Sequence, residues 1–502
     1  MTEKEVKLSS IVSELTGVKS RPTADPDITS VACDSRLVRP GSLFAAVRGV
    51  KTDGHAFIRD AAEKGAAAFI VEDETVETFG LPTMVVEDSE SALGRAASAF
   101  HGHPSRSLTL IGITGTNGKT TTSFLLQHIL RESGVVTGRM GTVGISFPSG
   151  EEGSSLTTPD APAFQAALAR MVAEGATAVV AEISSHALLR KRVEGSSFAC
   201  AVFTNLTQDH LDYHNTMEEY FEAKRLLFTD FPRLVEAVVN ADDPWGRQLA
   251  PELGGHVVTF GLNEGDVRME ITSSGSDGTE AVVHFPEGGH RLRIPLAGRF
   301  NASNAAAALA TAWALGLDPG RAVDALAHAP QTPGRLEAVE NPRGLSAFVD
   351  YAHTPDALER LLETLRPLTA GRLIVVFGCG GDRDKGKRPL MARAAARFAD
   401  LAVITADNSR SEQTSAILNA IEEGFPSDWR KAEPESELST GTWVRIEDRR
   451  DAIRWAAGVA RVGDTLVLAG KGHETTQIIG TSVMPFDDRK ELAAALAGGP
   501  GQ

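Results

Sequence analysis

Apolar residues in the first hundred positions of the chain occur in short runs that change their period several times. Residues 41–47 and the end of 56–73 read as short buried strands, whereas 91–100 has the spacing of a helix. The segment HGHPSRS at 101–107 is polar and contains glycine and proline, which interrupt regular structure. We therefore predict a first α/β domain over residues 1–104.

Buried strands alternate with helices in the next part of the chain. The strand-like run SLTLIGIT leads into a glycine-rich turn and the helical stretch TTTSFLLQHILRESG, and ATAVVAEIS and SFACAVFTNL read as further buried strands. Residues 265–297 alternate as short strands before an alanine-rich helix, and APQTPGRLEAV marks a break. This order predicts a central α/β domain with a phosphate-binding loop (P-loop) over residues 105–332.

The last part of the chain returns to the same alternation. LIVVFG, LAVITAD and DTLVLAG read as buried strands between helical segments, which is typical of an open, Rossmann-like α/β sheet. We predict such a domain over residues 333–502, so that the chain comprises three α/β domains.

The composition of the chain limits which binding partners and which cellular compartment are expected. A net charge of −16 and a pI near 5.4 argue against a nucleic-acid-binding surface, because phosphate binding needs clustered Lys and Arg. The three cysteines, Cys33, Cys200 and Cys379, lack disulfide-framework or zinc spacing, and the first residues show neither a signal peptide nor a spanning segment of about 20 apolar residues. We expect a monomeric cytoplasmic protein without membrane insertion.

The glycine-rich turn after LTLIGIT has the residues of an ATP site. In GTNGKTTT, Gly115 and Gly118 let backbone N–H groups approach phosphates, Lys119 reaches the β/γ oxygens, and Thr120 can ligate Mg²⁺. A strict P-loop has glycine five residues before Gly118, where this chain has Ile113, so the loop is a variant. The residues assigned to ATP here are Gly115, Thr116, Asn117, Gly118, Lys119, Thr120 and Thr121.

The variant loop sequence GTNGKTTT resembles the phosphate-binding loop of the Mur ligases and of the folylpolyglutamate synthetases. Resemblance to the tripeptide-forming, MurE-type members of the Mur ligase family extends over nearly the whole chain. The matching motifs, in order, are DSRLVRPGSLFAAVRG, TTPDA, EISSHAL, TNLTQDHLDYH, EAKRLLF, FNASNAAAA, PGRLE, VDYAHTPDAL, GCGGDRDKGKRP, DNSR and GKGHE. The resemblance implies an ATP-dependent amide ligase of peptidoglycan precursor synthesis.

By this resemblance, Lys119, Glu182, His210 and Lys224 are the catalytic residues. Two Mg²⁺ ions are implied, held by Thr120, Glu182, His210 and Lys224. The family's lysine at the position of Lys224 is carbamylated by CO₂ (N6-carboxylysine). This turns a cation into an anion that can organise a second Mg²⁺ beside the triphosphate.

The resemblance also assigns the remaining binding residues. The UDP-N-acetylmuramoyl dipeptide is assigned Ser35, Thr157, Thr158, Ser184, Arg190 and Arg192, although relatives can carry an amide side chain in place of Arg190. The resemblance further assigns ATP the residues Asn301, Arg335, Asp350 and His353. Asp350 and His353 lie in VDYAHTPD, which resembles the segment by which the last domain closes over ATP, and Arg335 lies at the hinge-like PGRLE. The incoming amino acid is assigned Arg383, Asp407, Asn408, Ser409, Arg410, Gly470 and Glu474.

The expected reaction joins meso-2,6-diaminopimelate to the D-glutamate γ-carboxylate of UDP-N-acetylmuramoyl-L-Ala-D-Glu through an acyl phosphate. Arg410 favours meso-diaminopimelate, because a guanidinium can bind its distal carboxylate, although Ser409 replaces the proline of the family's Asp-Asn-Pro-Arg motif. L-lysine and L-ornithine stay open as alternative substrates. Competing hypotheses are a folylpolyglutamate-synthetase-like ligase, a degenerate nucleotide-binding regulator, and a P-loop motor or GTPase.

Overall fold

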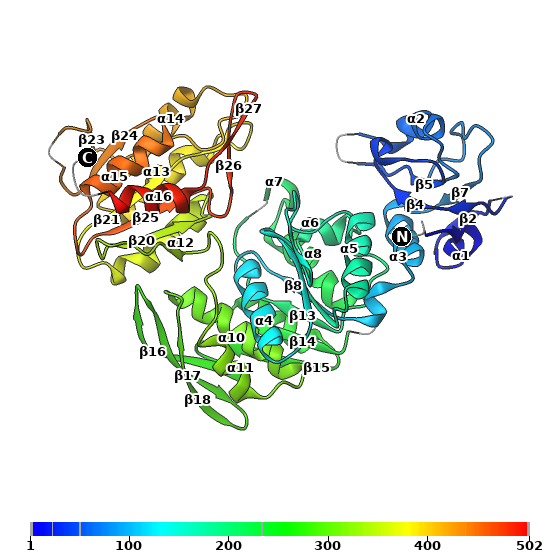
Figure 1. Cartoon of the computed structure of the whole chain (residues 1–502), viewed down its shortest axis with the longest axis horizontal. Coiled ribbons are helices and arrows are strands. Elements are labelled where there is room, and N and C mark those ends of the chain that lie inside the picture. The colour runs from blue at the N-terminus through cyan, green and yellow to red at the C-terminus, as the bar shows by residue number, and fades with distance from the viewer. Residues whose placement is uncertain are drawn as a thin grey trace. The chain divides into compact units, whose positions relative to one another are not determined.

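The structure is a computed structural model that describes residues 4–22, 24–49, 52–209, 211–231, 234–436 and 438–498 (Figure 1). The chain divides into two compact units of mixed α/β structure. The first comprises Met1–Arg268, Phe285–Glu287 and Asn304–Ala325, and the second Met269–His284, Gly288–Ser303 and Leu326–Gln502. The α/β class predicted from the sequence is confirmed, whereas the domain boundaries at 104 and 332 stay predictions.

The amino-terminal part of the first unit is a small sheet with helices on both faces. Its strands, in sheet order, are β2 (Val18–Ser20), β7 (Thr83–Val86), β6 (Ala68–Val71), β5 (Ser42–Ala45) and β4 (Ser30–Ala32). Helices α1 (Leu8–Val12) and α3 (Ser89–His101) pack on one face, and α2 (Ile58–Glu63) packs on the other. Helix α3 begins where the Asp88 carboxylate accepts the backbone N–H groups of Glu90 and Ser91, and it ends at Gly102 with φ 78°.

A larger sheet forms the centre of the first unit. Its strands β9, β12, β8, β13, β14 and β15 run parallel to one another. The strand order is β11 (Gly150–Glu152), β10 (Gly144–Phe147), β9 (Thr137–Gly141), β12 (Ala178–Glu182), β8 (Thr109–Thr114), β13 (Cys200–Phe203), β14 (Glu236–Asn240) and β15 (His256–Gly261). Parallel strands end at the same edge of a sheet, so the segments that follow β8, β12 and β13 are neighbours there. This edge carries most of the predicted site residues of the first unit.

Helices cover the central sheet and deliver side chains to this edge. They are α4 (Lys119–Glu132), α5 (Ala161–Ala173), α6 (Ser185–Leu189), α7 (Leu211–His214), α8 (Met217–Thr229), α9 (Pro244–Leu249) and α11 (Pro319–Leu326), while α10 (Arg299–Ala314) contains residues of both units. Helix α8 starts at Thr216, whose hydroxyl accepts the N–H of Glu219. Its apolar face, with Tyr220, Phe221 and Leu227, lies in the same hydrophobic core as Phe203 of β13.

The second unit contains another parallel sheet. Its strands, in order, are β19 (Glu337–Ala338), β20 (Ser346–Asp350), β25 (Thr465–Ala469), β21 (Leu373–Phe377), β22 (Leu401–Ile404), β24 (Thr442–Arg445) and β23 (Arg430–Ala432), and only β19 pairs antiparallel among these described strands. Strands β16 (Val267–Gly275), β17 (Gly278–Phe285) and β18 (Gly288–Ile294) follow β15 in the order of the larger sheet described above. The second unit also contains the hairpin of β26 (Thr476–Ile479) and β27 (Ser482–Pro485).

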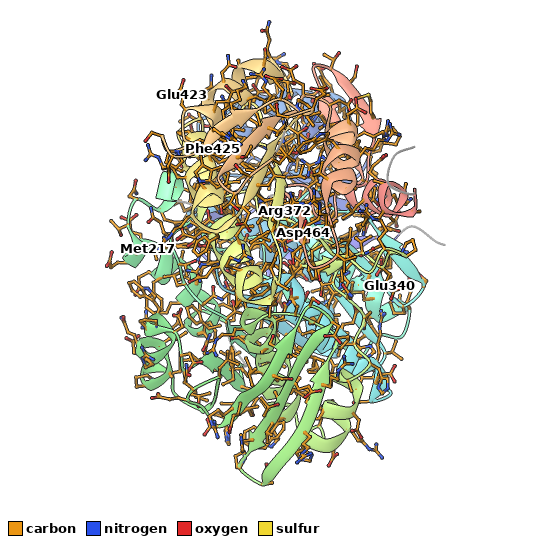
Figure 2. All side chains as sticks on the ribbon, turned by 90° about the vertical axis from the view of Figure 1, so that its left-hand side faces the viewer. Met217, Glu340, Arg372, Glu423, Phe425 and Asp464 are labelled. Carbon is orange, nitrogen blue, oxygen red and sulfur yellow. The ribbon has the colours of Figure 1, made fainter. Side chains whose placement is uncertain are left out.

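Separate hydrophobic cores lie on the two faces of this second sheet. Helices α12 (Pro355–Leu365), α13 (Lys387–Phe398) and α14 (Thr414–Glu422) build one core, and α15 (Arg449–Val459) and α16 (Asp488–Ala497) build the other. Arg372 and Asp464, labelled in Figure 2, form an ion pair of 2.7 Å that joins the starts of β21 and β25. No helix among the described residues is long and apolar enough to cross a membrane.

Candidate functional site

The predicted phosphate-binding loop lies between β8 and α4, as the sequence indicated. Gly115 has φ 146° and Gly118 has φ 87°, conformations that residues with a side chain rarely adopt. A Cβ atom at Gly115 would lie 1.9 Å from the Thr204 hydroxyl, and one at Gly118 would lie 2.3 Å from the Asn304 amide oxygen. Both glycines are therefore required by the backbone shape and by close packing.

The segment after β13 forms hydrogen bonds to the phosphate-binding loop. The Asn205 carbonyl accepts the Thr116 N–H at 2.9 Å, and its side-chain oxygen accepts the Asn117 N–H at 3.0 Å. The Thr204 hydroxyl donates to the Asn117 carbonyl at 2.6 Å. These contacts fix the loop before any ligand binds. Thr204 and Asn205 lie in the motif TNLTQDHLDYH, but no role was predicted for them from the sequence.

Two lysines converge on one carbonyl of this loop. The Lys119 ammonium donates to the carbonyls of Gly115 at 2.7 Å and Thr116 at 2.9 Å, and the Lys224 amine lies 3.0 Å from the same Gly115 oxygen. The Lys224 side chain is only 1% exposed. Burial, and then the neighbouring charge of Lys119, lower the pKa of the Lys224 amine well below its ordinary value. Lys224 therefore differs from an ordinary helix-surface lysine in both its burial and its pKa.

Glu182 is the last residue of β12, where the sequence placed it, and its side chain is fully buried. Its Oε2 accepts the hydroxyl of Thr120 at 2.9 Å and that of Thr142 at 2.9 Å, while Oε1 accepts the Thr142 N–H at 3.2 Å. A Cβ at Gly141 would lie 2.0 Å from Oε1, so glycine is needed beside this carboxylate. Thr142 is a contact that the sequence analysis did not anticipate.

The TTPDA turn lies against the same carboxylate-bearing strand end. The Thr157 hydroxyl is 3.1 Å from that of Thr142, and the Thr158 hydroxyl donates to the Glu182 carbonyl at 2.8 Å. Thr158 also accepts the Ser184 N–H at 3.1 Å, and its carbonyl accepts Arg192 at 3.1 Å. The predicted residues Thr157, Thr158, Ser184 and Arg192 thus form one connected group next to Glu182.

Other predicted acceptor and metal residues lie outside that group. Arg190 donates to the Arg48 carbonyl at 3.0 Å and pairs with Glu90 at 2.5 Å. Ser35 is buried at the start of a short 3₁₀ turn, and its carbonyl accepts the Lys64 ammonium at 3.0 Å. His210 lies outside the described residues, so its predicted role as a metal ligand is untested.

The predicted amino-acid residues of the second unit meet at the ends of β22 and β25. The Asn408 amide donates to Glu474 Oε2 at 2.8 Å, and the Lys471 ammonium reaches that oxygen at 3.1 Å and Asn408 Oδ1 at 3.2 Å. Lys471 is fully buried and also lies 3.8 Å from Asp407. Lys471 lies in the motif GKGHE, but no role was predicted for it from the sequence. Gly470, with φ 115°, provides the turn that places it.

Arg410 adopts a left-handed backbone conformation, with φ 50°, at the end of this group. Its Nη1 donates to the Gly381 carbonyl at 2.9 Å, which connects DNSR to the GCGGDRD loop. Ser409 is fully buried, and its hydroxyl is 2.7 Å from that of Thr414. Arg383 is exposed on the same glycine-rich loop. The predicted residues of DNSR, GKGHE and GCGGDRD are thus connected within one unit.

The residues assigned to closure over ATP cluster around the end of β20. Asp350 accepts the N–H groups of Leu336 at 2.6 Å and Ala352 at 2.7 Å, and burial raises the pKa of its carboxyl. The Arg335 guanidinium lies 4.9 Å from the Tyr351 ring centroid. His353 Nδ1 is 2.8 Å from the Tyr351 carbonyl, and burial lowers the pKa of that imidazole.

Asn301, the remaining residue of this set, donates its side-chain amide to the Ala297 carbonyl at 2.9 Å.

Known protein families and relatives resemble this chain over most of its length. Family models described as Mur ligase family, catalytic domain; Mur ligase middle domain; and Mur ligase, glutamate ligase domain match residues 27–101, 113–312 and 334–472. Two relatives are named UDP-N-acetylmuramoyl-L-alanyl-D-glutamate–2,6-diaminopimelate ligase. The one from Geobacter metallireducens is 45% identical, and the alignment covers 94% of this chain and 94% of that protein. The one from Geobacillus thermodenitrificans is 43% identical, and the alignment covers 98% of this chain and 99% of that protein.

A solved structure of a ligase with that same name is also similar. It shares 33% identity and a TM-score of 0.68, and the comparison covers 98% of this chain and 99% of that one. Domain matches in the expected order and full-length relatives above 40% identity lead to one conclusion. The chain belongs to the Mur ligase family.

Proposed function

We propose that this chain is an ATP-dependent ligase that adds meso-2,6-diaminopimelate to the D-glutamate γ-carboxylate of UDP-N-acetylmuramoyl-L-Ala-D-Glu. The observation that carries the proposal is the Glu182 carboxylate, which bonds to Thr120 of the phosphate loop and to Thr142, itself in contact with Thr157 of TTPDA. One carboxylate thereby connects a triphosphate site with the turn assigned to the acceptor. A phosphoryl transfer between the two substrates needs such proximity.

The reaction follows from the chemistry of a carboxylate, whose oxygen is a poor leaving group. Attack of the γ-carboxylate oxygen on the γ-phosphorus of ATP breaks the bond to the bridging oxygen and gives an acyl phosphate and ADP. The amine of diaminopimelate then attacks the acyl carbon, loses a proton and expels inorganic phosphate. Lys119, held over the loop by two carbonyls, is placed to follow the charge of the transferred group.

The residues around the loop fit magnesium, which prefers hard oxygen donors. The donors are the Thr120 hydroxyl and the Glu182 carboxylate, and His210 of the family motif lies outside the described residues. Magnesium bound there would neutralise charge on the triphosphate. These two side chains, 2.9 Å apart, orient each other before a metal arrives.

Lys224 fits the role of a lysine carbamate. Only a neutral amine adds to CO₂, and both burial and Lys119 favour the neutral form. The carbamate would be an anion beside the Lys119 ammonium, which would attract it. It would also supply a further oxygen donor for magnesium.

The amino-acid site is proposed to select the distal carboxylate of meso-diaminopimelate through Arg410. A guanidinium binds a carboxylate through two parallel hydrogen bonds, and L-lysine has no group to occupy it. Glu474, already an acceptor for two neighbouring side chains, offers an anion for an amino group. The proposal also includes a monomeric enzyme acting in the cytoplasm, which analytical ultracentrifugation and cell fractionation would test.

The experiment is ADP release by the purified protein with ATP, the UDP-dipeptide and either meso-diaminopimelate, L-lysine or L-ornithine. We expect release that requires both the dipeptide and the amino acid, with strong preference for meso-diaminopimelate. In Arg410→Ala, that preference should fall by about 10²-fold or more, because removing one partner of a buried charge pair costs about 2–5 kcal/mol. A parent enzyme that uses L-lysine equally well would contradict the substrate assignment, and release without the dipeptide would contradict the ligase.

A further inference from the structure

The hairpin of β26 and β27 is bonded to the DNSR turn rather than lying free beside it. Ile478 donates its N–H to Asn408 Oδ1 at 2.9 Å, and its carbonyl accepts the Arg410 N–H at 3.2 Å. The Gly480 N–H donates to the Arg410 carbonyl at 2.8 Å. The backbone of Arg410 is thus bonded to the hairpin on both its N–H and its carbonyl, as one more strand residue would be.

A further bond joins the hairpin to the residue at the start of this turn. The Gln477 amide donates to the Asp407 carbonyl at 3.3 Å. Gln477 is buried, so this bond is shielded from water. Residues 407, 408 and 410 are therefore all connected to the short stretch 477–480.

These contacts coincide with an unusual backbone conformation. Arg410 has φ 50°, which costs energy for a residue with a side chain and persists only where the surroundings enforce it. The hairpin bonds to the N–H and the carbonyl of Arg410 provide such surroundings.

We propose that the β26–β27 hairpin is a specificity-determining element, because it fixes Arg410 for a carboxylate on the incoming amino acid. Ile478 is its central positioning residue. This inference rests on the proposed function, since it deepens the role of Arg410.

The direction of the bonds allows a selective test. Ile478 pairs with Val483 in the hairpin, but its N–H and carbonyl both point to the turn rather than to β27. Proline lacks an N–H and is tolerated in an edge strand where that group is not part of the ladder. Ile478→Pro therefore removes the bond to Asn408 and keeps both the carbonyl that accepts the Arg410 N–H and the bonds between β26 and β27. The turn then loses the bond that holds it two residues before Arg410.

Val483→Pro is the matched control, because it places proline at the register partner on the other strand. Val483 is 62% exposed, and neither of the Ile478 bonds involves it. The measured quantity is the ratio of kcat/KM for meso-diaminopimelate to that for L-lysine, with the thermal midpoint recorded for each variant. We expect Ile478→Pro to lower the ratio about 10²-fold, because a group misplaced by about 1 Å can lose that much. Val483→Pro should keep it.

A second variant covers the case in which the single exchange loosens the whole hairpin. Ser409→Pro added to Ile478→Pro fixes φ of residue 409 inside the turn, and we expect it to recover most of the ratio. Equal loss in Ile478→Pro and Val483→Pro, or no loss in either, would overturn the inference. So would a folded double variant that recovers nothing. A parent without preference for meso-diaminopimelate would instead sink the proposed function, so the two failures are distinguishable.

Discussion

Thr142→Val tests whether Thr142 must orient the Glu182 carboxylate, which joins the two proposed substrate sites. The exchange removes the hydroxyl that donates to Glu182 Oε2 at 2.9 Å and contacts Thr157 at 3.1 Å. It keeps the side-chain shape and the backbone N–H that donates to Oε1 at 3.2 Å. Glu182 also keeps its bond from Thr120. The variant therefore loosens the carboxylate without leaving it unpartnered.

The magnitude follows from the charge on Glu182. A hydrogen bond to a charged group contributes about 1.5–3 kcal/mol, and each 1.4 kcal/mol is roughly tenfold in rate. If this bond orients the carboxylate in the transition state, kcat/KM for the UDP-dipeptide should fall about 10- to 100-fold. Valine and threonine have nearly the same volume, so the thermal midpoint should move little. Thr142→Ser keeps the hydroxyl and should stay within about threefold of the parent.

The assay is steady-state ADP release with the dipeptide and meso-diaminopimelate at several magnesium concentrations. A contribution to metal binding predicts that high magnesium recovers part of the lost activity. Thr142→Val with kcat/KM within about threefold of the parent at all magnesium concentrations would refute the reasoning. Equal losses in the valine and serine variants would do so as well, because the hydroxyl would then not be the operative group.

Further predictions concern three other side chains. Lys119→Ala should lower single-turnover phosphate transfer by about 10³-fold, since it removes the charge that follows the phosphoryl group; near-normal transfer would exclude that role. Lys224→Ala should be nearly inactive and partly recovered by short-chain carboxylates, and full activity without them would remove the carbamate hypothesis. Burial, and then the charge of Lys4, lower the pKa of His101 to about 4. In the unfolded chain His101 takes up a proton below about pH 6.5, whereas in the folded chain it does so only near pH 4, so the free energy of unfolding should fall as the pH falls from 6.5 towards 4. His101→Gln should remove part of this pH dependence, measured by urea unfolding at several pH values.

Much of the site could be predicted from the sequence where the signal is local. The glycines of GTNGKTTT, the strand that ends at Glu182 and the helix that carries Lys224 all follow from neighbouring residues and their periodicity. The structure confirms the α/β class and the placement of these elements. The assignment of roles depended on motif resemblance, because a strand-end carboxylate or a helix lysine alone is compatible with many functions.

The site residues that could not be predicted from the sequence are placed by contacts between positions far apart in the chain. Thr142 meets Glu182 across 40 residues, and Asn205 meets Asn117 across 88. No periodicity encodes such pairs. Lys471 is hydrophilic by type but fully buried, because Glu474 and the Asn408 amide oxygen compensate its charge. The β26–β27 hairpin did have a local signal, since Gly480-Thr481 lies between two apolar runs, but that signal cannot reveal its bonds to DNSR.

The pair of lysines on the Gly115 carbonyl links the fold of the first unit to its chemistry. Both side chains approach the same oxygen within 3.0 Å, and Lys224 is buried, so the protein keeps two basic groups together with little water to screen them. Burial, and then the charge of Lys119, lower the pKa of the Lys224 amine, so the pair favours one charged and one neutral group. A carbamate on Lys224 and a triphosphate on the loop would both be anions next to the Lys119 ammonium, which attracts each of them. The proposed substrate and the proposed modification of Lys224 would therefore both be stabilised by the charge of Lys119.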